Sequence, residues 1–184
     1  MSPMLRLLIL LTFTSTTFLS TAFSQNQVKN FSYFKLIVLN EKGQMLLVNY
    51  KDIWEPAGRK YDSTATMQVV LREMAREMGI EIKDLNLRAL VGKYYNQAQH
   101  PILFNYVTAK CKSGKLQVPP GCKDIKWYDI EEGIDLIPFK PMQVVLRKVF
   151  SEDEQSLWAG AFRIYTDPDP AKRRMEVIEE LYEF

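Results

Sequence analysis

Two glutamates separated by one helical turn are the residues of this sequence best suited to chemistry. Glu73 and Glu77 lie in the run Arg72–Ile80, and side chains three and four positions apart share one face of a helix. We therefore expect Glu73, Arg76 and Glu77 to project together. Carboxylate oxygens are the ligands that hard divalent cations bind, and such a cation takes several of them. The pair is a candidate site for a divalent metal ion.

A helix must present these glutamates, and the apolar pattern predicts one over Thr64–Met78. The apolar positions that recur at helical spacing are Met67, Leu71, Met74 and Met78. Gly79 follows, and glycine is typical of the left-handed position that ends a helix. The pattern predicts a helix with one face in the core and the two glutamates on another.

The segments around this helix resemble the signature of the Nudix hydrolases, G-x5-E-x7-R-E-U-x-E-E-x-G-U, in which U is an aliphatic residue. Gly58 stands at the first position, Arg72-Glu73 follow at the required spacing, and Gly79-Ile80 close the signature without a gap. The preceding Trp54–Gly58 is similar to the segment that leads into this signature, and Trp127–Asp129 resembles an aromatic strand end found downstream. The resemblance covers roughly Phe34 to Phe150.

The resemblance implies an α+β fold, a Nudix-type α/β/α sandwich with a mixed central sheet. It implies hydrolysis of a diphosphate linked to another moiety, with nucleoside diphosphate derivatives as the commonest substrates, so the expected partner is a small phosphorylated molecule. Glu73 and Glu77 would be the catalytic residues and would bind Mg²⁺ or Mn²⁺ together with the backbone oxygen of Ala57.

The sequence departs from the signature at two of its four acidic positions, which hold Thr64 and Arg76. A guanidinium beside an ion site repels the cation and pairs with the remaining carboxylates, so metal affinity and activity are expected to be weakened. Three acids outside the helix are possible substitute ligands: Glu55, Asp62 and Asp124. Alternatively, Arg76 and Arg59 bind a substrate phosphate directly. A catalytically inactive module that binds a ligand or a protein is the second hypothesis.

The other elements follow from hydrophobic patterns. Strands are expected at Phe34–Leu39, Met45–Val48, Leu87–Tyr95, Ile102–Lys110 and Ile125–Tyr128, and a second helix at Pro141–Phe150. Residues 151–184 are expected to form a helical extension packed on the domain, because Ser151 and Glu154 match a capping box and Pro170 suits a helix start. The spacing of Trp158, Phe162 and Tyr165 suits a helix face that covers either the domain or a second subunit. The sequence therefore allows a homodimer but does not require one.

Composition and the first residues bear on partners and compartment. Lys and Arg total 24 against 22 Asp and Glu, a formal net charge of +2 that gives no reason to expect a nucleic acid polymer as a partner.

Residues 1–24 have the layout of a secretory signal with cleavage before Gln25. This layout predicts an exported protein, periplasmic or secreted, with a domain at 25–150 and no membrane contact after cleavage. In an oxidising compartment Cys111 and Cys122 either form a disulfide or remain thiols. His100 is expected to be polar surface.

Overall fold

The computed structural model describes residues 32–151, 156–168 and 172–184. Within them, nine strands and three helices follow one another along the chain. The strands are β1 (Ser32–Leu39), β2 (Met45–Tyr50), β3 (Ile53–Glu55), β4 (Ala57–Tyr61), β5 (Ile80–Tyr95), β6 (Ile102–Gly114), β7 (Asp124–Tyr128), β8 (Trp158–Tyr165) and β9 (Arg174–Glu183). The helices are α2 (Met67–Glu77), α3 (Ile130–Leu136) and α4 (Lys140–Ser151).

The strands form one mixed sheet in the order β3-β2-β1-β6-β5-β8-β9, with β4 paired to β1 and β7 paired to β2. Two of the pairings are parallel, β1 with β6 and β5 with β8, and the others are antiparallel. The expected α+β fold with a mixed central sheet is confirmed.

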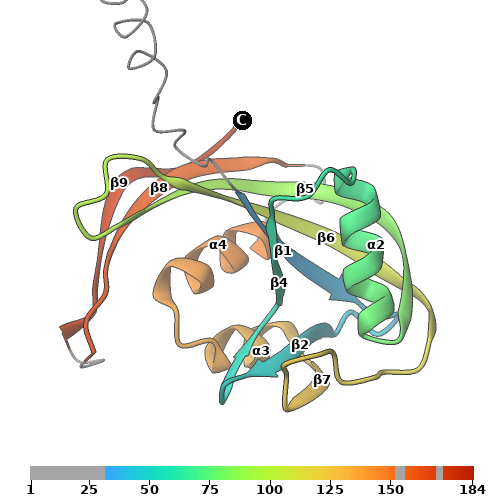
Figure 1. Cartoon of the computed structure of the whole chain (residues 1–184). Coiled ribbons are helices and arrows are strands. Elements are labelled where there is room, and N and C mark those ends of the chain that lie inside the picture. Colours follow the sequence, from blue (N-terminus) through green and yellow to red (C-terminus); the bar gives the residue numbers. More distant parts are fainter. Residues whose placement is uncertain (1–31, 152–155, 169–171) are drawn as a thin grey trace, which may run out of the picture. The chain divides into compact units, whose positions relative to one another are not determined.

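The sheet has a hydrophobic core on each of its faces. Alternate residues of a strand point to opposite faces, so Leu36 and Val38 of β1 enter one core and Ile37 enters the other. The first core packs against α2 through Val70, Leu71 and Met74, and the second packs against α3 and α4. Figure 1 shows α2 apart from the other two helices. The glutamate-bearing helix is thus anchored along its apolar side.

The C-terminal tail differs from the expected helical extension. Its described parts form two strands, β8 and β9, and β8 continues the sheet by pairing in parallel with β5 from Ala89 to Tyr95. The helical interpretation was wrong because residues four apart, such as Trp158 and Phe162, share a face in a strand as well as in a helix. Glu154 and Pro170, on which it also relied, lie outside the described residues.

The predicted helix at Thr64–Met78 is present but begins later, at Met67, and ends at Glu77. Met67 was expected in the core, yet it is 43% exposed because it stands at the first helical position, and Val70 is buried instead. Gly79 adopts φ +76°, as expected for a residue that terminates a helix. In the described ranges, no helix is sufficiently long and apolar to span a membrane.

Candidate functional site

The candidate site is formed where α2 lies beside β4. Arg59 of β4 forms an ion pair with Glu77 through Nη2, and its Nη1 lies 3.9 Å from Oε2 of Glu73. The side chain of Arg59 is 30% exposed, that of Glu77 is 43% exposed and that of Glu73 is 45% exposed, so solvent reaches all three. Met74 and Met78 of the same segment are buried. The structure therefore brings Glu73, Glu77 and Arg59 together at the surface.

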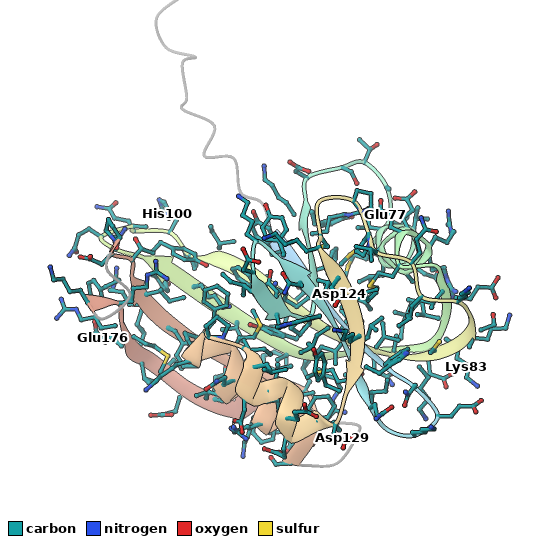
Figure 2. All side chains as sticks on the ribbon, turned by 90° about the horizontal axis from the view of Figure 1, so that it is seen from below. Glu77, Lys83, His100, Asp124, Asp129 and Glu176 are labelled. Atoms are coloured by element: carbon teal, nitrogen blue, oxygen red, sulfur yellow. The ribbon has the colours of Figure 1, made fainter. Side chains whose placement is uncertain are left out.

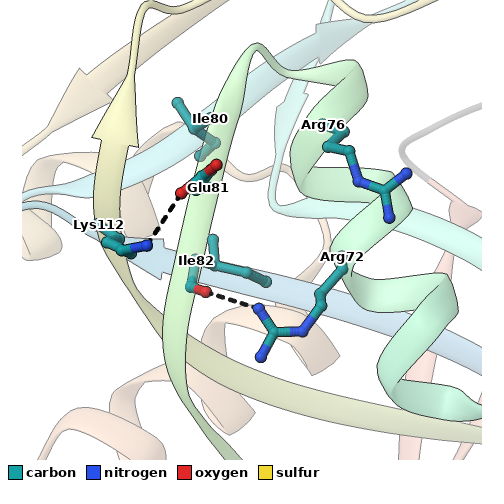
Figure 3. Close-up of a pocket in the computed structure, with 6 residues that line it drawn as sticks. All are labelled: Arg72, Arg76, Ile80, Glu81, Ile82 and Lys112. Atoms are coloured by element: carbon teal, nitrogen blue, oxygen red, sulfur yellow. Dashed lines mark hydrogen bonds and ion pairs between the residues drawn. The ribbon is translucent and has the colours of Figure 1, made fainter.

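Arg76 is not part of this group. It lines a cavity of about 230 Å³ between α2 and the start of β5, together with Arg72, Glu81 and Lys112. Arg72 donates to the carbonyl oxygen of Ile82 (Figure 3). The side chain of Arg76 makes no hydrogen bond or ion pair with any residue that the structure describes. Glu81 forms an ion pair with Lys112, and the hydrogen bond from Lys112 lowers the pKa of the Glu81 carboxyl. The helix thus directs Arg72 and Arg76 to a different side from the two glutamates.

Each of the three substitute acids has a lysine partner. Glu55 points to the interior, where its Oε2 accepts a hydrogen bond of 2.7 Å from Lys35. Asp62 pairs with Lys60, and Asp124 pairs with Lys126, which lowers the pKa of the Asp124 carboxyl. Across the described residues, no group of three or more His, Cys, Asp or Glu side chains is arranged to hold a metal ion. The acidic set at the site therefore consists of Glu73 and Glu77.

Sequence reasoning missed two buried lysines. Lys35 and Lys93 are 6% and 4% exposed, and each lies on the face of the sheet that carries the second core. Lys93 donates to the hydroxyl of Tyr106 at 3.0 Å and lies 3.9 Å from the ring centre of Phe104. Burial, and secondarily the charge of Lys35, lowers the pKa of Lys93 to about 7. The signal was the strand alternation, which places Lys93 at an inward position two residues after Val91.

The histidine of the sequence lies away from the site. His100 is in the connection between β5 and β6, at the opposite end of the view from Glu77 (Figure 2). Cys111 and Cys122 are free thiols, and burial raises the pKa of each.

Comparisons with known proteins address the fold. No protein-family model matches the sequence, and no curated protein matches it either. Solved structures do match: a mutator MutT protein from Bacillus halodurans has a TM-score of 0.61 at 17% identity, over 79% of this chain and 97% of that one. The NUDIX domain of NrtR from Shewanella oneidensis, solved with ADP ribose, has a TM-score of 0.55 at 13% identity, over 72% and 96% of the two chains. An ADP-ribose pyrophosphatase from Streptococcus suis has a TM-score of 0.53 at 11% identity, over 75% and 100%.

These likenesses, together with the mixed sheet and its flanking helices, show that the chain has the Nudix fold. The site described above lies on the helix that carries the Nudix-like signature.

Proposed function

We propose that this protein hydrolyses a diphosphate linked to another moiety, such as a nucleoside diphosphate derivative, with Mg²⁺ or Mn²⁺ at a weakened site. Glu73, Glu77 and the carbonyl oxygen of Ala57 would hold the ion. The observation that carries the proposal is the pair of exposed carboxylates on α2 that share the guanidinium of Arg59, two residues after Ala57 in β4. The Nudix fold supports it, because the signature-like segment runs from β4 through α2.

The donor groups suit the proposed ion, although they are few. Mg²⁺ commonly binds through one or two carboxylates and completes its shell with water and with phosphate oxygens of the substrate. Two glutamates and a carbonyl oxygen therefore fit an ion that arrives together with its substrate. Such an ion, when bound, neutralises phosphate charge and lowers the pKa of a coordinated water.

Arg59 links the two binding events. Without an ion, its guanidinium pairs with Glu77 and lies within ion-pair distance of Glu73, which offsets part of their negative charge. These carboxylates would hold a divalent cation whose charge would repel the guanidinium, and Arg59 would then be available to bind a substrate phosphate through two parallel hydrogen bonds. Arg76, which has no partner in the described regions, is a second candidate ligand for a phosphate of the substrate. With a divalent cation bound, the positive charges of Arg59 and the ion would together exceed the negative charges of the two glutamates, which favours an anionic ligand.

A second function is favoured by the missing acids. Thr64 and Arg76 stand where the signature has glutamates, and the described residues contain no group of three or more potential metal-binding side chains. In this alternative the fold binds a phosphorylated ligand or a protein without hydrolysis. Replacement of Thr64 and Arg76 by glutamate would then create metal binding that the natural chain lacks.

The test of hydrolysis is release of phosphate products from a panel of nucleoside diphosphate derivatives, including ADP-ribose, with Mg²⁺ or Mn²⁺. We expect slow metal-dependent turnover that Glu77→Gln abolishes. Glu179→Gln is the matched control, because Glu179 is an exposed glutamate of β9 and lies outside the proposed site. Absence of turnover across the panel with either metal ion would favour the binding module.

We also propose that the protein is exported and that residues 1–24 are removed, on the grounds of the leader-like sequence alone. Mass spectrometry of the protein recovered outside the cytoplasm should give a chain that starts at Gln25. A full-length mass would contradict cleavage.

A further inference from the structure

Residues 55–58, which comprise the last residue of β3, the turn after it and the first two residues of β4, are called the β3–β4 loop. This loop precedes Arg59, joins the backbone pairing of β4 with β1, and contacts one buried side chain of β1, Lys35. The side chain of Lys35 is 7% exposed, and its Nζ donates to Oε2 of Glu55 at 2.7 Å and to the carbonyl oxygen of Pro56 at 3.4 Å. Glu55 is 17% exposed, so both members of the ion pair are largely removed from water. Two consecutive residues immediately before Ala57 are therefore fixed by the same ammonium group.

The same lysine also contacts the residue after Ala57. Lys35 is the β-sheet partner of Gly58, and a Cβ atom added to Gly58 would lie 2.7 Å from Nζ, 3.1 Å from Cε and 3.3 Å from Cδ of Lys35. The backbone at Gly58 thus lies directly on the lysine stem, closer than a residue with a side chain allows. Lys35 therefore contacts the chain on both sides of Ala57, in addition to the backbone pairing of β4 with β1.

The position of this loop decides what faces α2. Arg59 follows Gly58 directly, and its guanidinium reaches both Glu73 and Glu77. Lys35 forms no ion pair with Glu73 or Glu77, so any effect on the site passes through the loop. A buried amine is needed here because an apolar side chain of similar length would leave the Glu55 carboxylate without a partner.

We propose that Lys35 is a positioning residue for the metal and phosphate site, holding residues 55–58 so that Ala57 and Arg59 are placed against Glu73 and Glu77. The assignment rests on the proposed function for the identity of the ligands. The anchoring itself rests on the contacts of Lys35.

The experiment compares the full chain with Lys35→Met and with the double variant Lys35→Met, Glu55→Gln. The single variant leaves a buried carboxylate unpaired and should lose stability, whereas the double variant removes both charges and should recover most of the melting temperature. Two quantities are measured in each protein: the Kd for Mn²⁺, and amide hydrogen exchange of residues 57–59 relative to β6.

If Lys35 positions the loop, the double variant regains stability but still binds Mn²⁺ about tenfold more weakly, as for other residues that orient metal ligands. Exchange at residues 57–59 should be at least several-fold faster, with β6 unchanged. Exchange at the wild-type rate in both variants would overturn the proposal, whether or not the wild-type protein binds Mn²⁺. So would faster exchange with unchanged Mn²⁺ affinity.

The proposed function fails separately. If wild-type protein binds no Mn²⁺ while the variants show faster exchange at residues 57–59, Lys35 still positions the loop and Arg59, and only the metal assignment is lost.

Discussion

At the scale of single residues, Arg59 occupies the side of α2 on which a metal ion would bind. Its guanidinium is paired with Glu77 and lies 3.9 Å from Glu73, and all three side chains are partly exposed. Because the guanidinium and a divalent cation compete for the same oxygens, metal binding without substrate must displace Arg59. Under the proposed function, the displaced guanidinium would bind a phosphate of the substrate.

Arg59→Gln should therefore strengthen Mn²⁺ binding to the substrate-free protein and weaken substrate binding. Removal of one charge at this distance in a solvated site changes the binding free energy by on the order of 1 kcal/mol, a few-fold in Kd. Titration calorimetry gives the Kd for Mn²⁺, and steady-state kinetics gives KM. For the Mn²⁺ titration, Arg76→Gln is the control, because Arg76 is not paired with Glu73 or Glu77. An equal gain in both variants would show that Arg59 has no special position.

Lys93 offers a test of buried charge. Its pKa in the folded protein is lowered to about 7 by burial, whereas an unfolded lysine has its ordinary value near 10.5. Between these values the unfolded chain binds the proton and the folded chain does not, so the free energy of unfolding rises with pH. The slope reaches about 1.4 kcal/mol per pH unit and is lost below pH 7, where both states are protonated.

Lys93→Met should remove this slope. The change that it causes in the free energy of unfolding should therefore be more favourable at pH 7 than at pH 10. Denaturant unfolding at several pH values between about 6.5 and 10 measures the free energy of unfolding of both proteins. Lys83→Met, a change at an exposed lysine of β5, should leave the slope intact. Parallel pH profiles for wild type and Lys93→Met would contradict a shifted lysine.

At the scale of elements, the end of α2 depends on a glycine in a crowded position. Gly79 has φ +76°, and a Cβ atom there would lie 2.2 Å from the carbonyl oxygen of Lys115. The backbone of the segment after β6 is held against this turn, since Lys115 donates to Gly79 and Gln117 donates to Met78. The helix with Glu73 and Glu77 is thus fixed at its C-terminal end.

Gly43 provides a matched comparison, because it has the same φ of +76° but has no atom within 4 Å of an added Cβ. Gly43→Ala should cost about 1 kcal/mol, the conformational penalty alone. Gly79→Ala should cost more than 3 kcal/mol, because backbone atoms must also move. Thermal unfolding monitored by circular dichroism checks both, and equal losses would show that the contact at Lys115 is not restrictive.

Local patterns were enough to predict the elements that bury one clear face. The strands β1 and β2 and the helices α2 and α4 were predicted because their apolar residues alternate or recur at one spacing. In the tail, Trp158 and Phe162 fit two periods equally well, and Gly160 between them was not recognised as a sign of close backbone approach. A Cβ atom added to Gly160 would lie 3.1 Å from the carbonyl oxygen of Glu179, so β8 approaches the backbone of β9 closely at this glycine.

The site was predictable only where helical spacing decided it. Spacing placed Glu73 and Glu77 one turn apart, but it also grouped Arg76 with them, and only the sheet shows that Arg76 faces β5. The pairing of Arg59 with both glutamates depends on β4 and α2 meeting in space, which no local pattern contains.

At the scale of the whole molecule, the tail completes the sheet. β8 covers the edge of β5 along seven paired residues from Ala89 to Tyr95. Trp158 and Phe162 are 6% and 1% exposed and belong to the second core. The buried guanidinium of Arg88 donates to the carbonyl oxygens of Ser156 and Val149, each at 3.0 Å. The tail therefore supplies both apolar contacts and a hydrogen-bond acceptor to the rest of the fold.

A chain that ends at Ser151 should consequently fail to unfold as one cooperative unit. Loss of two buried aromatic side chains costs roughly 3–5 kcal/mol each, which is comparable to the whole stability of a typical domain. Differential scanning calorimetry should show one transition for the full chain and a broad transition, or none, for the truncated chain. A chain without residues 1–24 is the control and should melt as the full chain does. If the truncated chain kept a sharp transition within a few degrees of the full chain, β8 and β9 would be an appendage, and the domain would end at α4.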